Sequence, residues 1–268
     1  MTTSFKTSII KDKVSYTQEN THTIQKTFTS KEEVKKQEVF VIQCKETENI
    51  SYDIQIVLKE NTNVHIIIYN QTEVDVFHNI TLSSELKKNS NLLISCINEE
   101  EGKSSIKIIN NLKGEQAQVE VKSLNIGKGS AMSDVQIQNI SHASDTKGNI
   151  LNRVILDESA QCQMQSAPVV QLGASGCVSH LEQKTLILGQ NNRIISIPVL
   201  SVSNNQVEAS HTSTISTFQE EDLFYLQSRG LDKDEAKHLL LDAFIQHIIE
   251  NIPYTQETQG IVPFKSFL

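Results

Sequence analysis

Short runs rich in valine and isoleucine recur along most of this chain, and their spacing limits the folds that it can adopt. Runs centred near positions 66, 80, 93, 107, 120 and 136 follow one another at nearly even intervals. Many of them alternate apolar and polar side chains, with β-branched residues prominent, which is typical of strands. Gly, Asn, Ser and charged residues lie between the runs and favour turns. The pattern predicts a β core over residues 37–216.

Two architectures fit this spacing. A repeat of two strands, about 27 residues long, is what a solenoid of stacked coils requires. An antiparallel sandwich would also give many short, evenly spaced strands. The chain has no Asn-Gly or Asp-Gly pair of the kind that marks tight hairpins, which favours coils. The Asn-Asn pairs at 110–111, 191–192 and 204–205 are expected at coil corners, where a left-handed backbone is useful.

After residue 216 the apolar period changes to that of helices. Thr217 and Glu220 have the spacing of a capping box, and the first helix is expected to stop at Gly230. Asp232 and Glu235 predict a second helix that opens in the same way. The apolar stripe expected on that second helix consists of Ala236, Leu239, Leu240, Phe244, Ile248 and Ile249. Residues 217–268 therefore form a predicted C-terminal helical domain and tail.

The first 36 residues are polar and form a separate predicted segment, in which "TSKEEVKKQEV" could be a short helix. They contain no apolar core of a secretory signal, and no apolar run in the chain approaches the roughly 20 residues that span a bilayer. The four cysteines, Cys44, Cys96, Cys162 and Cys177, form no CxxC pair. We therefore expect a cytoplasmic protein without membrane insertion.

Charge and motifs exclude further classes of function. The net charge is −8, and residues 218–268 carry nine acids against four bases, which is −5 of that total. Nucleic-acid binding requires clustered positive charge, so no nucleic-acid partner is expected. The usual nucleotide, metalloprotease and hydrolase motifs are absent. A solenoid carbohydrate enzyme would need clustered carboxylates, whereas Asp134, Asp145, Asp157 and Glu158 are scattered. We expect no enzyme activity.

His211 is the strongest single candidate for a site. In a strand from Val207 to Ile215 it shares one face with Val207, Ala209, Ser213 and Ile215, and these small neighbours leave room around it. An imidazole there could ligate a metal or carry a proton, although a hydrogen-bonded structural histidine would give the same pattern.

Three other residues are weaker candidates. Cys177 and His180 form a lone C-x-x-H pair, and a metal site needs three or four ligands, so a small buried thiol explains Cys177 as well. His142, at the end of a predicted strand, reads as a surface histidine.

The stretch "DLFYLQSRG" places Leu223, Phe224, Tyr225 and Leu226 side by side on the first helix. Four bulky residues in a row cover more than half of the circumference of a helix. One helix packed on one sheet cannot bury all of them, so a second partner is expected.

The segment from Ile197 to Ile245, "IPVLSVSNNQVEASHTSTISTFQEEDLFYLQSRGLDKDEAKHLLLDAFI", resembles the SufB/SufD family of iron–sulfur cluster assembly proteins. The match consists of a proline-led strand, a strand ending in Ser-His-x-Ser-Thr, an acidic helix with "LFYLQSRGL", and a second helix with "EAKHLL". Residues 134–163 agree more loosely with the family pattern. The region before residue 130 shares only its general pattern of short β runs.

This resemblance implies a right-handed parallel β-helix with a C-terminal helical domain. Family members pair with a second SufB/SufD-type chain, and their helical domains bind an ABC-type ATPase, SufC. The resemblance assigns the ATPase-binding surface to Leu223, Phe224, Tyr225, Leu226, Arg229 and Gly230. It assigns the interface between the two chains to Pro198, Val207, Ala209 and Ser213. The family histidine that contributes to cluster assembly falls on His211, so a transient iron–sulfur cluster is expected rather than a tightly bound cofactor.

The chain departs from the family pattern at three positions. Gln183 stands where SufB members have a cysteine, Thr212 where they have a glutamate, and Ala209 where SufD members often have a cysteine. The chain therefore looks SufD-like, and both a heterodimer and a homodimer stay open. A solenoid that binds partners without any metal role is the alternative.

Overall fold

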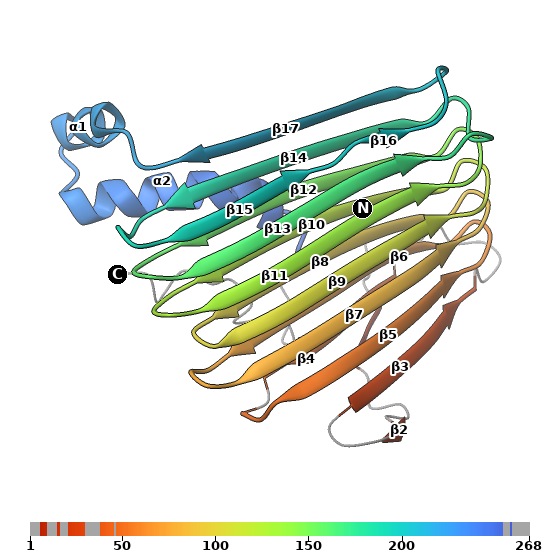
Figure 1. The fold of residues 1–268 in the computed structure, drawn as a ribbon, viewed down its shortest axis with the longest axis horizontal. Coiled ribbons are helices and arrows are strands. Elements are labelled where there is room, and N and C mark those ends of the chain that lie inside the picture. Colours follow the sequence, from red (N-terminus) through yellow and green to blue (C-terminus); the bar gives the residue numbers. More distant parts are fainter. Residues whose placement is uncertain are drawn as a thin grey trace.

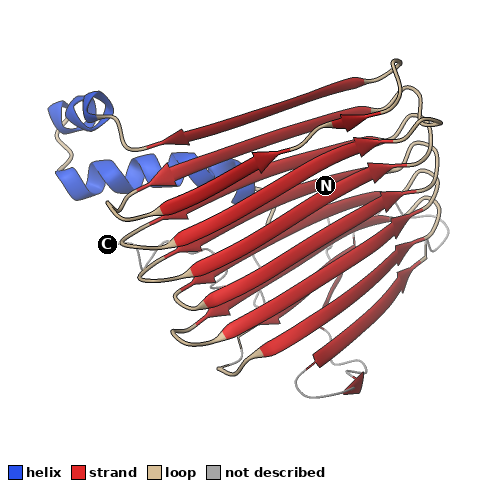
Figure 2. Ribbon diagram, viewed as in Figure 1, coloured by secondary structure: helices blue, strands red, loops and turns tan. Residues whose placement is uncertain are grey.

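The computed structural model describes residues 6–9, 15–16, 21–29, 38–45, 47–253 and 258. Two facing sheets wind into a solenoid, and two helices follow at its C-terminal end (Figure 1, Figure 2). All strand pairs in the described residues are parallel except β2 with β3. The predicted parallel β-solenoid is confirmed, and the antiparallel sandwich is wrong.

The two sheets share one design, in which successive strands of a coil alternate between them. Sheet A contains, in spatial order, β1 (Lys6–Ile9), β4 (Glu38–Cys44), β6 (Asn63–Thr72), β8 (Asn91–Glu100), β10 (Gln118–Gly127), β12 (Lys147–Leu156), β14 (Val178–Ile187) and β17 (Glu208–Ser216). Sheet B contains β15 (Arg193–Pro198), β13 (Gln161–Val170), β11 (Met132–Ser141), β9 (Lys103–Leu112), β7 (Phe77–Leu86), β5 (Ile50–Leu58), β3 (Thr21–Phe28) and β2 (Ser15–Tyr16), and β16 (Ser201–Val202) pairs with β13.

Equivalent positions on successive coils give the length of a coil. Asn70 of β6 and Asn98 of β8 pair in register and bond to each other at a sequence separation of 28. Thr146 and Cys177, which precede β12 and β14, contact each other at a separation of 31. The period expected from the sequence is therefore slightly short, because the corner loops lengthen towards the C-terminus.

Parallel register stacks like residues above one another inside the solenoid. In sheet A, Ile66, Ile94, Val121 and Ile150 occupy one such column, and all four are buried. Because strand side chains alternate between faces, one column of β-branched residues per inward position builds a continuous core. The core thus runs through every coil, as expected for a repeat protein whose single coils cannot fold alone.

Polar side chains also point into this core, where they bond to one another. Asn70, Asn98 and Asn125 form a ladder across β6, β8 and β10. Beside it, the buried carboxyl of Glu100 accepts hydrogen bonds from Asn98 Nδ2 and Ser104 Oγ. Burial outweighs these hydrogen bonds and raises the pKa of Glu100 to about 7.

The corners of the coils use left-handed backbone conformations. Those with positive φ are Asn61, Asp75, Asn89, Gln116, Asp145 and Glu158, together with Gly129 and Gly176. The Asn-Asn pairs were expected at such corners, and two of them, 191–192 and 204–205, do lie in corner loops, although without positive φ. The prediction is wrong for the third pair. Asn110 and Asn111 lie inside β9, and Asn110 bonds inward to Asn139 Oδ1 at 2.8 Å.

The helices are α1 (Glu220–Ser228) and α2 (Lys233–Ile249), and Gly230 joins them with φ +101. That left-handed value favours glycine, as the sequence predicts. The capping box of Asp232 and Glu235 on α2 is confirmed. The one predicted at Thr217 is wrong, because α1 begins after Gln219, whose side chain makes no cap hydrogen bond.

Helix α2 lies on the outer face of sheet A and contacts β10 and β12 (Figure 1). Its buried residues are Ala236, Leu241, Ile245 and Ile248. The last three pack in one cluster with Leu124, Ile126 and Ile155 of the sheet. The predicted stripe is therefore right at Ala236 and Ile248 but misplaced at Leu239, which is exposed. Neither helix in the described part of the chain has the length and hydropathy needed to cross a bilayer.

Strands β1 and β3 belong to the first 36 residues and pair with β4 and β5. The short helix predicted in "TSKEEVKKQEV" falls mainly on residues 30–37, which lie outside the described residues. The limits of the three predicted segments stay predictions.

Candidate functional site

The last coil of the solenoid has no coil above it in the described residues. Strand β17 pairs with β14 along one edge only, and β15 and β17 end their sheets (Figure 2). In β14 the inward residues Ser179, Leu181 and Gln183 are buried, whereas in β17 nearly every residue is exposed. The open end therefore presents an unpaired strand edge and an uncovered inner face.

His211 lies on this uncovered inner face. It pairs in register with Leu181, whose side chain is buried one coil below, so its imidazole points the same way as the core residues. Unlike them it is exposed. Of its predicted neighbours, Val207 packs against the small cluster of Val170, Ala174 and Cys177, and Ala209 is half-buried.

A polar row leads from the interior to the open end beside His211. Gln183 Nε2 donates to Ser196 Oγ, and Ser196 Oγ bonds Ser213 Oγ at 2.8 Å across β15 and β17. Gln183 is fully buried, and its Oε1 has no hydrogen-bond partner among the described residues. Gln183 thus faces inward, one coil below Ser213. Pro198 ends β15 at the same end of the solenoid.

The other candidate ligands do not assemble into a site. Cys177 is buried, with its Sγ 3.2 Å from Thr146 Oγ1, and His180 faces outward with Nδ1 2.8 Å from Ser210 Oγ. Burial raises the pKa of the Cys96 and Cys162 thiols to about 12. Within the residues that the structure describes, no three His, Cys, Asp or Glu side chains are grouped so that they could hold a metal.

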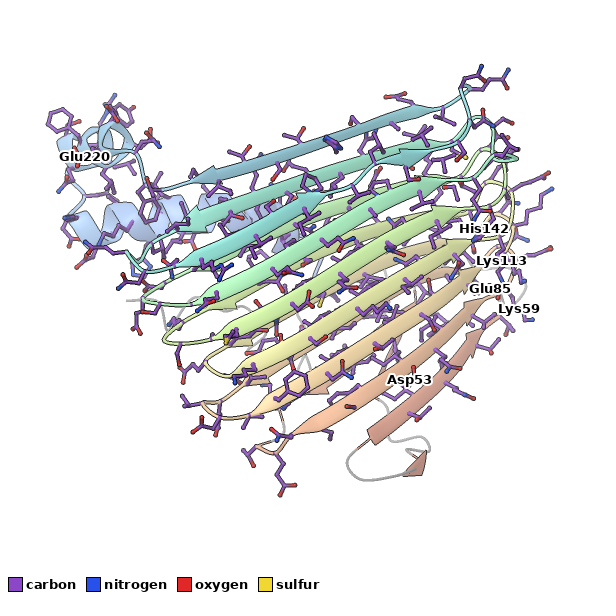
Figure 3. All side chains as sticks on the ribbon, viewed as in Figure 1. Asp53, Lys59, Glu85, Lys113, His142 and Glu220 are labelled. Carbon is purple, nitrogen blue, oxygen red and sulfur yellow. The ribbon has the colours of Figure 1, made fainter. Side chains whose placement is uncertain are left out.

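The predicted surface histidine, His142, lies along one edge of the solenoid among the corner residues (Figure 3). Its two ring nitrogens bond Asn111 Oδ1 at 3.0 Å and Gln171 Oε1 at 3.1 Å, on the coils below and above. It therefore belongs to a ladder that joins neighbouring coils.

Helix α1 is a second exposed feature, and none of its residues is buried. Phe224 is 74% exposed and Tyr225 56% exposed, whereas Leu223 and Leu226 are half-buried. The Arg229 guanidinium lies 5.3 Å from the Tyr225 ring centroid, at the point where Gly230 turns the chain. The structure thus leaves two aromatic rings of α1 uncovered, and that of Tyr225 lies beside a cation.

Two charged residues were missed by the sequence reasoning. Lys122 of β10 and Arg153 of β12 are buried beneath α2, in strands that otherwise read as alternating apolar runs. The signal that could have found them is their parity, since both share the outward face with Leu124, Leu151 and Ile155, which a helix must cover.

Comparison with known proteins is consistent with this arrangement. Residues 16–244 match the family described as "SUF system FeS cluster assembly, SufBD core domain". An iron–sulfur cluster assembly SufBD family protein of Synechocystis is 30% identical over 199 residues, which is 74% of this chain and 44% of the relative. The iron–sulfur cluster assembly protein SufD of Bacillus subtilis is 26% identical over 143 residues, which is 53% of this chain and 33% of the relative.

A SufBD family protein of Staphylococcus aureus is 30% identical over 143 residues, 52% of this chain and 30% of the relative. The matched part of the chain thus spans less than half the length of these curated relatives.

Proposed function

Because the chain belongs to the SufBD core-domain family of the SUF iron–sulfur cluster assembly system, we propose that it is a non-catalytic scaffold subunit of a SUF-type complex in the cytoplasm. Its cargo is a nascent iron–sulfur cluster. Its partners are a second SufB/SufD-type chain, either a SufB-like chain or an identical copy, and a SufC-like ATPase.

The open end of the solenoid carries the pairing part of this proposal. A solenoid needs its terminal coils covered, and a long unpaired strand edge is a template for another chain. Strand β17 combines both conditions, since its residues 208–216 have a free edge and an exposed inner face. Pairing through β17 and β15 would bury Pro198, Ala209 and Ser213 and would bring His211 to the boundary between two chains.

Helix α1 is the proposed docking surface for the ATPase. Exposed aromatic side chains and arginine are the residue types that dominate binding energy at interfaces. Phe224, Tyr225 and Arg229 supply them, with Leu223, Leu226 and Gly230 shaping the same turn of chain. The acids at the start of α1, Glu220 (Figure 3), Glu221 and Asp222, would favour a partner with a basic rim.

The docking proposal is tested by the affinity of the chain for a SufC-type ATPase. Phe224→Asp should weaken it by about 30-fold or more, the effect of losing an interface residue worth about 2 kcal/mol. Leu226→Asp should weaken it too, although Leu226 is half-buried and so also probes folding. Leu172→Asp is the matched control, because Leu172 is 79% exposed on a turn of the solenoid. Unchanged binding by Phe224→Asp would refute the docking surface.

The cluster role of His211 requires ligands beyond this residue. The four cysteines are buried, so a cluster at His211 would draw thiolate ligands from the partner chain. Anaerobic reconstitution with iron and sulfide, in the presence of the partner chain, should give less visible absorbance for His211→Ala than for wild type. His180→Ala, one strand away on the outer face, is the control and should match wild type.

The buried thiols also favour a second candidate, a solenoid that binds partners without any metal role. If His211→Ala and wild type gain the same absorbance, this second candidate replaces the first.

A further inference from the structure

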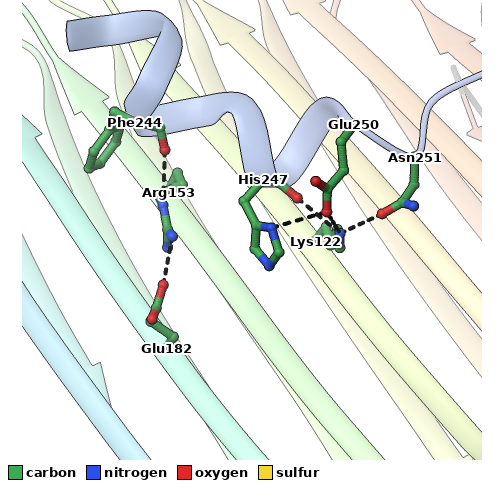
Figure 4. A network of polar contacts seen from close by, with 7 residues as sticks. All are labelled: Lys122, Arg153, Glu182, Phe244, His247, Glu250 and Asn251. Carbon is green, nitrogen blue, oxygen red and sulfur yellow. Dashed lines mark hydrogen bonds and ion pairs between the residues drawn. The ribbon is translucent and has the colours of Figure 1, made fainter.

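Two cations are buried on the outer face of sheet A, where α2 covers it. The side chain of Lys122 is 3% exposed and that of Arg153 is 7% exposed. Removing a charge from water is costly unless it is paired and hydrogen-bonded. Each side chain must therefore have specific partners beneath the helix, and Figure 4 shows them.

The ammonium group of Lys122 contacts the C-terminal end of α2. Nζ donates to the carbonyl oxygen of His247 at 2.9 Å, to Glu250 Oε1 at 3.0 Å and to Asn251 Oδ1 (Figure 4). The last carbonyls of a helix lack partners within the helix, and its C-terminus favours positive charge. A single strand residue thus holds the end of α2 through three acceptors.

The histidine beside Lys122 adds no competing positive charge. His65 has its Nε2 2.9 Å from Ser95 Oγ, and burial together with Lys122 lowers the pKa of His65 to about 4. The imidazole is therefore neutral at physiological pH. Lys122 in turn lowers the pKa of Glu250, with a smaller contribution from His247, so the carboxylate stays charged.

Arg153 holds α2 one turn earlier and also reaches the next strand. Its Nε donates to the carbonyl oxygen of Phe244 at 3.1 Å, and the guanidinium carbon lies 5.6 Å from the Phe244 ring centroid. The remaining nitrogens bond Asn152 O at 3.1 Å and Glu182 Oε1 of β14 at 2.6 Å. Arg153 therefore joins α2, β12 and β14 in one contact (Figure 4).

Packing alone would not fix the helix in this way. Leu241, Ile245 and Ile248 bury an apolar stripe on the sheet, but apolar contacts are non-directional and permit sliding and rotation. Hydrogen bonds to charged groups have defined geometry. A methionine at 122 or 153 would bury a similar volume without the cost of desolvating a charge, so stability by itself does not call for cations here.

We propose that Lys122 and Arg153 are positioning residues. They hold α2 at one position along sheet A and in one rotation about its own axis. This rests on the proposed ATPase docking at α1, which contacts α2. Motion of the ATPase then reaches β10, β12 and β14, in the upper coils of the solenoid, directly through α2. Without the two contacts the helix pair would follow the ATPase while the solenoid stayed still.

This positioning role is tested on the full chain by pulsed electron spin resonance, which measures the distance between two spin labels. Asp242→Cys on α2 and Lys107→Cys on β9 provide exposed sites, and the four native cysteines are buried. The labelled wild type should give one narrow distance distribution. The pair Lys122→Met with Arg153→Met should broaden it by about twofold or more, because directional bonds are lost. Lys122→Arg, which keeps the charge, should stay narrow.

Three comparisons make this test decisive. Lys184→Met is the matched control, since Lys184 is 41% exposed and bonds the same Glu182 at the rim. If the double methionine variant fails to fold, Arg153→Lys, which keeps the charge and loses the planar fork, provides the measurement. A variant distribution as narrow as that of wild type overturns the proposal.

The link to the ATPase has its own readout. When the ATPase and a non-hydrolysable ATP analogue are added, amide hydrogen exchange in β10 and β12 should change in the wild-type chain. The double variant Lys122→Met with Arg153→Met should abolish this change. Its affinity for the ATPase should stay within about twofold of wild type, because α1 is untouched. An identical change in both would overturn the transmission. If the wild-type chain binds no ATPase, the docking proposal fails. The distances between the spin labels still test whether Lys122 and Arg153 position α2.

Discussion

Strands β14 and β17 are neighbours in the same sheet, with the same parallel pairing and the same alternation, yet they differ sharply in burial. Every inward residue of β14 has a coil above and below it, whereas β17 has only the coil below in the described part of the chain. Burial in this fold therefore comes from the next coil rather than from the strand itself. The comparison identifies the last coil as the place where the fold is incomplete without a partner.

The middle coils and the last coil also differ in the side chains that line the interior of the solenoid. Middle coils fill the interior with isoleucine columns and with asparagine ladders whose side chains bond to one another. Towards the end the interior turns polar, from Gln183 through Ser196 and Ser213 to the level of His211. An exposed polar end tolerates water in the free chain and offers hydrogen bonds to a partner.

The largest expected effect separates a middle coil from the last one. Ile94→Ala, at a fully buried column position of β8, should reduce the free energy of unfolding by about 2–5 kcal/mol. Ile215→Ala, on the inner face of β17 and 50% exposed, should cost the isolated chain less than about 1 kcal/mol. Urea unfolding of both variants measures the difference. Equal losses would mean that the last coil is already covered.

The next effect concerns the acid sealed inside a middle coil. Burial raises the pKa of Glu100 to about 7 from 4.5, so the folded state binds its proton more tightly than the unfolded state does. Its contribution to stability is complete below pH 4.5 and is lost as the pH rises through 7.

Glu100→Gln, which cannot ionise, should therefore gain up to about 3 kcal/mol over wild type between pH 4.5 and pH 8. Unfolding free energies measured across that range test this expectation. If the unfolding free energies of the two proteins vary with pH in the same way, the Glu100 carboxyl is not buried from water.

The smallest effect belongs to a carboxylate on the coil edge. Hydrogen bonds and charge from Lys113 and Lys87 lower the pKa of Glu85 to about 2. Glu85 and Lys113 bridge neighbouring coils (Figure 3). Because the site is partly exposed and screened, Glu85→Gln should cost less than about 1 kcal/mol at pH 7.

That small contribution should vanish as the pH falls from 4.5 towards 2, the reverse of the trend for Glu100. A loss at pH 7 as large as that of Ile94→Ala would contradict a surface role for this ladder.

The sequence predicted the regularly spaced strands, the helix pair and the inward face of His211, because each depends on local periodicity. The choice of a solenoid over a sandwich depended instead on the missing hairpin signals and on the family resemblance. Alternation sets which residues point inward, and Gly230 and Asp232 set where the helices turn and begin. The left-handed corner positions were not predicted, because single Asn, Asp, Gln and Glu residues hold them rather than the Asn-Asn pairs. There the stacking of one coil on the next overrides the preference of the single residue.

The attachment of α2 could not be predicted for a related reason. Leu241 and Ile245 are buried instead of Leu239 because the sheet, not the helix, decides which stripe is covered. Lys122 and Arg153 look like ordinary exposed charges in a strand until a helix 91 to 128 residues later lies across them. Contacts at that sequence separation carry no local signal.

The central claim is that the open edge of β17 joins another chain, and the direction of its backbone amides allows a direct test. The N–H of Glu208 donates to Cys177 O of the preceding coil, so even-numbered residues of β17 face β14 and odd-numbered ones face the free edge. Ser213→Pro removes a backbone donor from the free edge, together with the exposed hydroxyl contact to Ser196, whereas Thr214→Pro breaks the ladder to β14.

Light scattering during size-exclusion chromatography, for the 30.0 kDa chain alone and mixed with a SufB-type chain, is the deciding measurement. The account predicts a particle containing two solenoid chains for wild type and monomers of normal stability for Ser213→Pro. Thr214→Pro should instead lower the stability of the monomer itself. A wild-type chain that stays monomeric in every mixture, or a Ser213→Pro variant that pairs as well as wild type, would contradict it.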